Sequence, residues 1–196
     1  DEMREAIELG VKSFKFFTAY GASGRRTDTG PLLQAFQALA DMDGVAVVHA
    51  EDDSMIETFS GLLSNEEWGR MESVAKVRPD VCEASAVNTV GWLAARTGVR
   101  CHIVHLSSTL GLEEALYARE RGADLSLETC PQYLLLTSDV YSGPEGHLYS
   151  AAPALRSVKD NEVLWDALSS GEIDFAATDH CPFTRTQKEW KGAFDR

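Results

Sequence analysis

Four residues of types that bind metals or move protons lie at or near the ends of predicted β-strands. They are Lys15, in the stretch SFKFFTAY, followed along the chain by His49, His105 and Asp179. Histidine and carboxylate ligands together suit zinc or another borderline divalent ion. A lone strand-end histidine is usually a structural residue, and a lone aspartate usually caps a helix. Four such residues at one end of a single sheet instead favour a metal site.

Lys15 is the unusual member of this set, because a protonated ammonium beside a metal ion would be repelled. With a lowered pKa, the amine could act as a general base or form a Schiff base. It could also react with carbon dioxide to give a carbamate, which would bridge two ions about 3.5–4 Å apart. In the simplest structural interpretation, Lys15 lies at a strand edge and extends its ammonium into water. The residue type alone leaves these alternatives open.

The segments that must position these residues alternate between strand-like and helical patterns. Strands are predicted over residues 12–18, 45–49, 101–108, 124–130 and 172–180. Helices are predicted over residues 2–9, 30–42, 54–63, 65–77, 81–97, 109–121 and 158–169, with a long loop over 131–156. This alternation predicts an α/β fold with a parallel sheet, either doubly wound or part of a barrel. In both arrangements, ligands bind at the carboxyl ends of the strands.

The composition limits the classes of partner. The chain has 196 residues, of which 44% are hydrophobic, and a formal net charge of -13. An acidic surface argues against nucleic acid and anionic membranes as partners. No apolar run reaches the roughly 20 residues needed to cross a bilayer. The cysteines are well separated and form no CxxC pair, which is typical of reduced, buried thiols in a cytoplasmic protein.

Five motifs, in this order and at these spacings, resemble those of the cyclic amidohydrolases: SFKFFTAY, VVHAED, HIVHLSS, ETCPQYLLLT and ATDHCPF. The resemblance covers essentially the whole chain. It is strongest to the D-hydantoinase and dihydropyrimidinase group, with the allantoinases and dihydroorotases as relatives. It implies a TIM-type (β/α)8 barrel, in which the strands of this chain are the fourth to the eighth. It also implies a metal-dependent hydrolase that opens the ring of a cyclic amide.

The resemblance implies a metal-binding role for each of the first four residues. Lys15 would be carboxylated by carbon dioxide and would bridge two divalent ions, usually zinc. Asp179 would bind the first ion and also shuttle a proton. His49 and His105 would bind the second ion.

The resemblance also places two residues beside the substrate. Tyr20 would polarise the carbonyl that is attacked by a metal-bridged hydroxide during ring opening of hydantoins or dihydropyrimidines. The loop YSAAPALR has Ala152 where hydantoinases commonly have a serine whose backbone contacts the substrate amide. A backbone contact survives the change to alanine. Because alanine also occurs there in allantoinase-like relatives, allantoinase- or dihydroorotase-type activity is the alternative.

The resemblance predicts that this chain is one part of a longer protein. The family has a His-x-His metal motif on its first barrel strand, and no such motif occurs in this sequence. Residues 1–196 are therefore expected to form a single partial barrel, without the N-terminal strands and the small β-sandwich domain. The whole protein would be a cytoplasmic homo-oligomer, usually a tetramer.

Two other classes of protein compete with the cyclic amidohydrolase interpretation. Some relatives with this fold have lost metal ligands and serve as non-catalytic scaffolds. Mononuclear deaminases have a similar site but lack the carboxylated lysine. The chain keeps all four ligands that it is long enough to contain, which favours the two-metal hydrolase.

Several neighbouring residues have ordinary structural interpretations. His102 precedes His105 by three positions and is expected on the opposite face of the strand, against a helix or solvent. Glu51 is expected to cap a helix or to support a metal ligand. Cys130 and Cys181 are expected to be buried thiols rather than nucleophiles.

Overall fold

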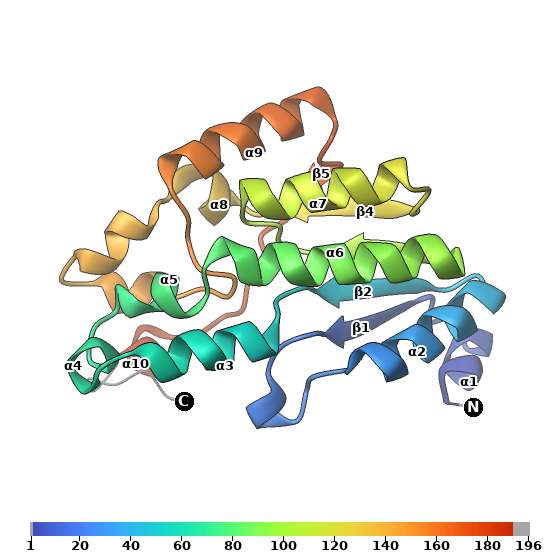
Figure 1. The fold of residues 1–196 in the computed structure, drawn as a ribbon, viewed down its shortest axis with the longest axis horizontal. Helices are drawn as coiled ribbons and strands as arrows, with labels where there is room; N and C mark the ends of the chain where they lie inside the picture. Colours follow the sequence, from blue (N-terminus) through green and yellow to red (C-terminus); the bar gives the residue numbers. More distant parts are fainter. Residues whose placement is uncertain (1, 190–196) are drawn as a thin grey trace.

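The computed structural model describes residues 2–189, which form a five-stranded parallel sheet with helices packed on it (Figure 1). The strands are β1 (Ser13–Phe17), β2 (Val45–His49), β3 (Arg100–Ile103), β4 (Leu125–Thr129) and β5 (Phe175–Ala176). Their spatial order is β1-β2-β3-β4-β5, the same as their order in the chain. A doubly wound sheet reverses its strand order at a switch point. The unbroken order therefore favours the barrel over the doubly wound alternative.

The helices follow the strands as the sequence pattern predicts, with a few additional short elements. The described helices are α1 (Glu2–Glu8), α2 (Thr29–Asp41), α3 (Asp53–Leu62), α4 (Asn65–Trp68), α5 (Ser73–Val77), α6 (Asp80–Thr97), α7 (Thr109–Glu120), α8 (Pro131–Leu135), α9 (Val158–Ser170) and α10 (Arg185–Lys188). Short 3-10 turns are η1 (Gly21–Ser23), η2 (Ser138–Ser142) and η3 (Gly146–Tyr149). Gly98 ends α6 with a φ of 71°, in the left-handed region that glycine adopts without strain.

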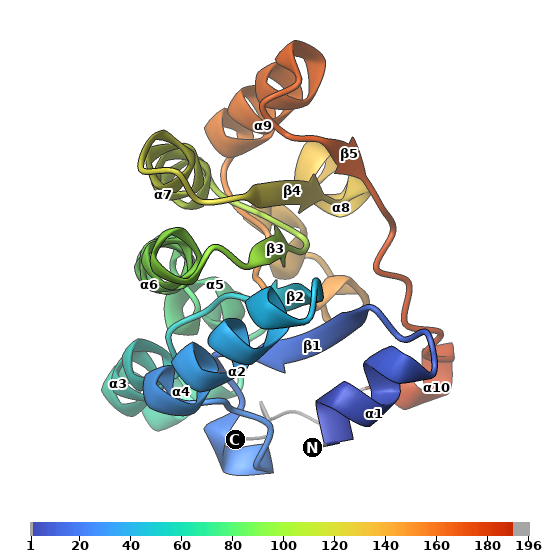
Figure 2. The same cartoon turned by 90° about the vertical axis from the view of Figure 1, so that its right-hand side faces the viewer.

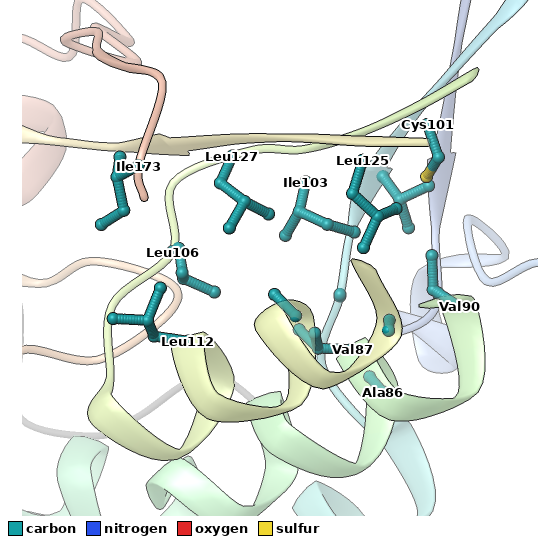
Figure 3. Close-up of a cluster of buried hydrophobic side chains, with 14 of the residues drawn as sticks. Ala86, Val87, Val90, Cys101, Ile103, Leu106, Leu112, Leu125, Leu127 and Ile173 are labelled. Atoms are coloured by element: carbon teal, nitrogen blue, oxygen red, sulfur yellow. The ribbon is translucent and has the colours of Figure 1, made fainter. Parts of the chain in front are cut away.

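One face of the sheet makes the hydrophobic core, because alternate side chains of each strand point to the same side. Ile103 and Leu127 on this face are buried against Val87 and Val90 of α6 and Leu112 of α7 (Figure 3). In Figure 2, α6 and α7 lie side by side on this side of the sheet.

The opposite face of the sheet is more polar and less covered. It carries side chains at the alternate positions of the strands: Lys15, Val47, His102, Ser126 and Glu128. Among the described residues, each edge strand, β1 and β5, has one neighbouring strand only. This second face is the side that points inward in a closed barrel.

Four predicted boundaries were wrong. The helix expected over residues 65–77 is two short helices, because α4 ends at Trp68 and α5 begins at Ser73. The loop expected over 131–156 contains α8, η2 and η3. The strand expected over 101–108 ends at Ile103. The last strand pairs with β4 through only Phe175 and Ala176, both of them exposed.

The close approach of α6 and α7 leads to a prediction about the free energy of unfolding. A Cβ added at Gly91 of α6 would lie 2.4 Å from the Cβ of Ala118 in α7, so the two helices would have to separate. We expect Gly91→Ala to lower the free energy of unfolding by about 1–3 kcal/mol, the usual cost of overpacking. Urea unfolding measures the change.

The matched control for this prediction is Gly61→Ala in α3, where an added Cβ would meet no atom within 4 Å. Alanine is preferred over glycine inside a helix, so this variant should be neutral or more stable by up to about 1 kcal/mol. Equal effects at the two positions would mean that α6 and α7 do not approach as closely as described.

Candidate active site

The carboxyl ends of the parallel strands meet at one edge of the sheet and bring the predicted site residues there. In Figure 1 the arrowheads of β1 and β2 point to the side of the molecule where α3, α4 and α5 lie. Lys15 is inside β1, and His49 is the last residue of β2. His105 and Asp179 follow β3 and β5 by two and three residues.

Side-chain hydrogen bonds fix the end of β1 against the end of β2. The hydroxyl of Thr18 donates to the carbonyl oxygens of His49 and Glu51, at 3.1 and 2.8 Å. The backbone N–H of Glu51 donates to the same hydroxyl at 3.0 Å. The backbone that carries His49 is therefore held against Thr18, which precedes Tyr20 by two residues.

Backbone strain is concentrated at the predicted site. Among the described residues, four that are not glycine have a positive φ: Tyr20 (69°), Asp43 (55°), His105 (45°) and Asp179 (45°). Three of these are predicted site residues. Left-handed conformations are costly for residues other than glycine and cluster at active sites. All three lie just beyond the carboxyl end of a strand.

Two buried histidines lie in direct contact at this edge. The Nδ1 of His49 lies 2.9 Å from the Nε2 of His105, and the two side chains are almost completely buried. The Nε2 of His49 lies 2.9 Å from the Oε2 of Glu51. Burial, the neighbouring His49 and the charge of Lys15 hold the pKa of His105 well below its usual value. His105 is therefore neutral at physiological pH, which is the form that binds a metal ion.

Lys15 projects from the open face of the sheet next to these histidines. Its Nζ lies 5.2 Å from the centroid of the Phe17 ring. Lys15 is exposed on this face, and the partial burial of its ammonium lowers its pKa, although Asp179 and Glu128 act in the opposite direction. A lowered pKa increases the neutral fraction of the amine, which is the form that reacts as a nucleophile or base.

Tyr20, Ala152 and Asp179 are among the residues that line a cavity of about 640 Å³. The ring of Tyr20 packs on that of His49, with centroids 5.0 Å apart. Burial raises the pKa of Tyr20, so its phenol keeps its proton at neutral pH and can donate a hydrogen bond. A cavity of this size holds a small ring with a substituent.

The donor chemistry at the edge suits a divalent ion only in part. In the part of the chain that the structure describes, no group of three or more histidine, cysteine, aspartate or glutamate side chains could hold an ion by itself. The His49 and His105 nitrogens converge, and the carboxylate on the second nitrogen of His49 is the usual outer partner of a metal-binding histidine. Among the described residues, these side chains alone do not complete a metal site.

Some expectations for neighbouring residues were wrong. His102 lies on the open face of the sheet, where its Nδ1 is 2.8 Å from the Oγ of Ser126 and its ring stacks on Phe175. Alternation failed because His105 lies beyond the end of β3. Cys130 is buried as expected, but Cys181 is exposed in the segment after β5. Asp52, not Glu51, caps α3, which leaves Glu51 free to hold His49.

Sequence reasoning missed two residues at the site. The Oε1 of Glu128 in β4 accepts a hydrogen bond from the backbone N–H of His105 at 3.2 Å, which supports its unusual φ. Arg78, after α5, contacts both Tyr20 and Glu51. The sequence signal for Glu128 was its place at a strand end, whereas Arg78 lies between α5 and α6 and gave no signal.

The sheet and its helices match solved structures of barrel hydrolases. D-hydantoinase from Bacillus sp. AR9 superimposes with a TM-score of 0.90 at 32% identity, over 96% of this chain and 42% of that one. Dihydropyrimidinase from Brevibacillus agri NCHU1002 gives a TM-score of 0.89 at 29% identity, over 94% of this chain and 41% of that one. The fold is thus an α/β fold that corresponds to a portion of the TIM barrel of these amidohydrolases.

Comparison with curated sequences also finds hydantoinases. D-phenylhydantoinase from Escherichia coli O81 (strain ED1a) is 35% identical over 199 residues, covering 100% of this chain and 42% of the relative. No family model matches the chain. The resemblance to the cyclic amidohydrolases, and within them to the hydantoinase and dihydropyrimidinase group, is therefore confirmed. The chain spans less than half the length of these relatives.

Proposed function

We propose that the protein to which this chain belongs is a metal-dependent hydrolase that opens the ring of a cyclic amide. Hydantoins and dihydropyrimidines are the proposed substrates, since the relatives are named for them. The observation that carries the proposal is the contact between the buried His49 and His105, together with Tyr20, which packs on His49 and lines a cavity of about 640 Å³.

The side chains that line the cavity fit the steps of ring opening. Water adds to the carbonyl carbon, the bond from this carbon to nitrogen breaks, and the nitrogen gains a proton. Tyr20, whose phenol is protonated, would donate a hydrogen bond to the carbonyl oxygen. Asp179 would take the proton from water and give it to the leaving nitrogen. The backbone at Ala152 would orient the ring amide.

Two divalent ions, most suitably zinc, would be held by these residues. We assign His49 and His105 to one ion, Asp179 to the other, and a carboxylated Lys15 to both. The ions would act as Lewis acids on the carbonyl and lower the pKa of water. In the carboxylation, the neutral amine of Lys15 bonds to the carbon of carbon dioxide and loses a proton. The lowered pKa of Lys15 supports this step, because it raises the fraction of neutral amine.

The architecture of the whole protein is also a proposal. We propose that residues 1–196 form one partial barrel domain, with β1 to β5 as strands four to eight. The other strands and a small β-sandwich domain would lie in the rest of a longer chain. That protein would be a cytoplasmic homo-oligomer, and a tetramer is the proposed form. The coverage of 42% of the relatives and the open face of the sheet support this arrangement.

The net charge and the helices of the chain are relevant to nucleic acid and to membranes, respectively. A formal net charge of -13 supports the proposal that nucleic acid is not a partner. None of the helices in residues 2–189 has the length and apolar character needed to pass through a bilayer.

A side-by-side assay tests the proposed function. The full-length protein that contains this sequence is purified with metal and bicarbonate and given hydantoin, phenylhydantoin, dihydrouracil, allantoin and dihydroorotate. We expect the largest kcat/KM for a hydantoin or for dihydrouracil. Dominant turnover of allantoin or dihydroorotate would assign the alternative activity that Ala152 suggests, and no turnover of any ring would favour a non-catalytic scaffold.

A further inference from the structure

Arg78 contacts two parts of the site at once. Its guanidinium lies over the ring of Tyr20, with Cζ 5.2 Å from the ring centroid. Its Nη1 also donates a short hydrogen bond to the Oε2 of Glu51. This same oxygen lies 2.9 Å from the Nε2 of His49. A single side chain therefore links Tyr20 to the carboxylate that orients His49.

Glu51 depends on this partner because it is completely buried. Its carboxylate forms an ion pair with the guanidinium of Arg78. A buried charge without a partner is strongly destabilising. Among the described residues, the Oε1 of Glu51 has no hydrogen-bond partner, so its Oε2 carries the contacts to both His49 and Arg78.

Other hydrogen bonds fix the backbone of Arg78. Its carbonyl oxygen accepts a short hydrogen bond from the Nη1 of Arg156, a side chain that is 7% exposed. The Nε of Arg156 donates to the Oγ of Ser107 at 3.1 Å, and this hydroxyl donates to Glu83 at 2.9 Å. Ser107 lies two residues after His105. Arg78 is thus tied to the chain that follows β3 and to the loop that carries Ala152.

We propose that Arg78 is a positioning residue, which holds the ring of Tyr20 directly and the ring of His49 through Glu51. The proposal rests on the proposed function, in that it takes Tyr20 and His49 to be working residues of the site. It predicts that the side chain of Arg78 contributes to turnover without touching the substrate.

The chemistry of this position requires arginine. The planar guanidinium can stack on an aromatic ring and donate in its own plane to a carboxylate. A lysine ammonium is a point charge and would keep the attraction to Glu51 but lose the guanidinium contact over the Tyr20 ring. Arg78→Lys should therefore retain the folded state and lose part of the activity.

The first test uses steady-state kinetics of the full-length protein. We expect Arg78→Lys to lower kcat about 10- to 100-fold, the usual effect of removing an outer partner of a catalytic ligand. The KM should change much less, because Arg78 does not touch the substrate. The matched control is Arg100→Lys, since Arg100 is an exposed partner of Asp43 at the start of β3. An unchanged kcat for Arg78→Lys would overturn the proposal.

A double-mutant cycle separates positioning from a general loss of structure. If Arg78 acts partly by orienting the phenol, Arg78→Lys should cost less in a Tyr20→Phe background than in the wild type. For Arg78→Ala, added guanidinium ion should restore part of kcat, which it would not do for a collapsed site. Equal costs in the two backgrounds together with no rescue would contradict a positioning role.

A structural readout remains informative if the proposed function fails. Crystal structures of the wild type, Arg78→Lys and Arg78→Ala report the rings of Tyr20 and His49 without any substrate. We expect both rings to shift in Arg78→Ala, while β1 to β4 stay in place. Unmoved rings in Arg78→Ala would overturn the proposal. If the wild type shows no turnover but the rings shift in Arg78→Ala, the proposed function is rejected and the positioning role is retained. If Arg78→Ala does not fold, Arg78→Lys supplies the comparison.

Discussion

Asp179→Asn in the full-length protein is expected to lower kcat by at least about 10²–10⁴-fold, the range that general acid–base catalysis contributes. Asparagine has the same shape but cannot take a proton from water and pass it to the leaving nitrogen. The backbone at Asp179 has a φ of 45°, which asparagine tolerates. The substitution therefore removes the chemistry and keeps the conformation. Steady-state kinetics with the best substrate of the assay measure the loss.

Asp43→Asn is a matched control for this variant. Asp43 also has a left-handed φ, of 55°, but it pairs with Arg100 on the surface just before β2 begins. Its substitution should leave kcat within about twofold, since surface pairs contribute little. An Asp179→Asn variant as active as Asp43→Asn would remove Asp179 from the mechanism.

Lys15→Ala is expected to reduce both the bound metal and kcat. The alanine cannot form a carbamate, so neither ion keeps the shared ligand that we assign to Lys15. We expect kcat to fall by more than about 10³-fold, because metal ions supply both the nucleophile and the Lewis acid in such sites. Elemental analysis after dialysis, together with kinetics, measures the two effects.

Lys12→Ala controls for the loss of a lysine, because Lys12 is exposed just before β1. It should keep wild-type metal content and activity. Reconstitution of the metal-free wild type should also depend on bicarbonate, whereas that of Lys15→Ala should not. A Lys15→Ala protein with unchanged activity and metal content would instead favour mononuclear, deaminase-like chemistry.

The part of the fold that follows from apolar periodicity could be predicted from the sequence. The run at residues 45–49 is β2 as expected, and the helix expected over 81–97 is α6 with one more residue at its start. These elements are buried in one core, so their patterns reflect their packing. Lys15 inside β1 and His49 at the end of β2 were also visible in the sequence, because each interrupts an apolar run.

The rest depends on conformations and contacts that periodicity does not encode. His105 leaves the strand with a φ of 45°, so counting alternate residues from it placed His102 on the wrong face. Arg78 reaches the site only because the chain turns between α5 and α6. Its partners are far away in sequence, and no local pattern predicts such a contact.

Metal analysis of crystals is the most direct test of the proposed two-metal site. The full-length protein, grown with zinc and bicarbonate, is measured by anomalous diffraction at the zinc edge. We expect two zinc ions per chain, one bound to His49 and His105 and one to Asp179, with a carboxylated Lys15 as a ligand of both. A single ion, or an unmodified Lys15 with no metal at the histidines, would contradict it.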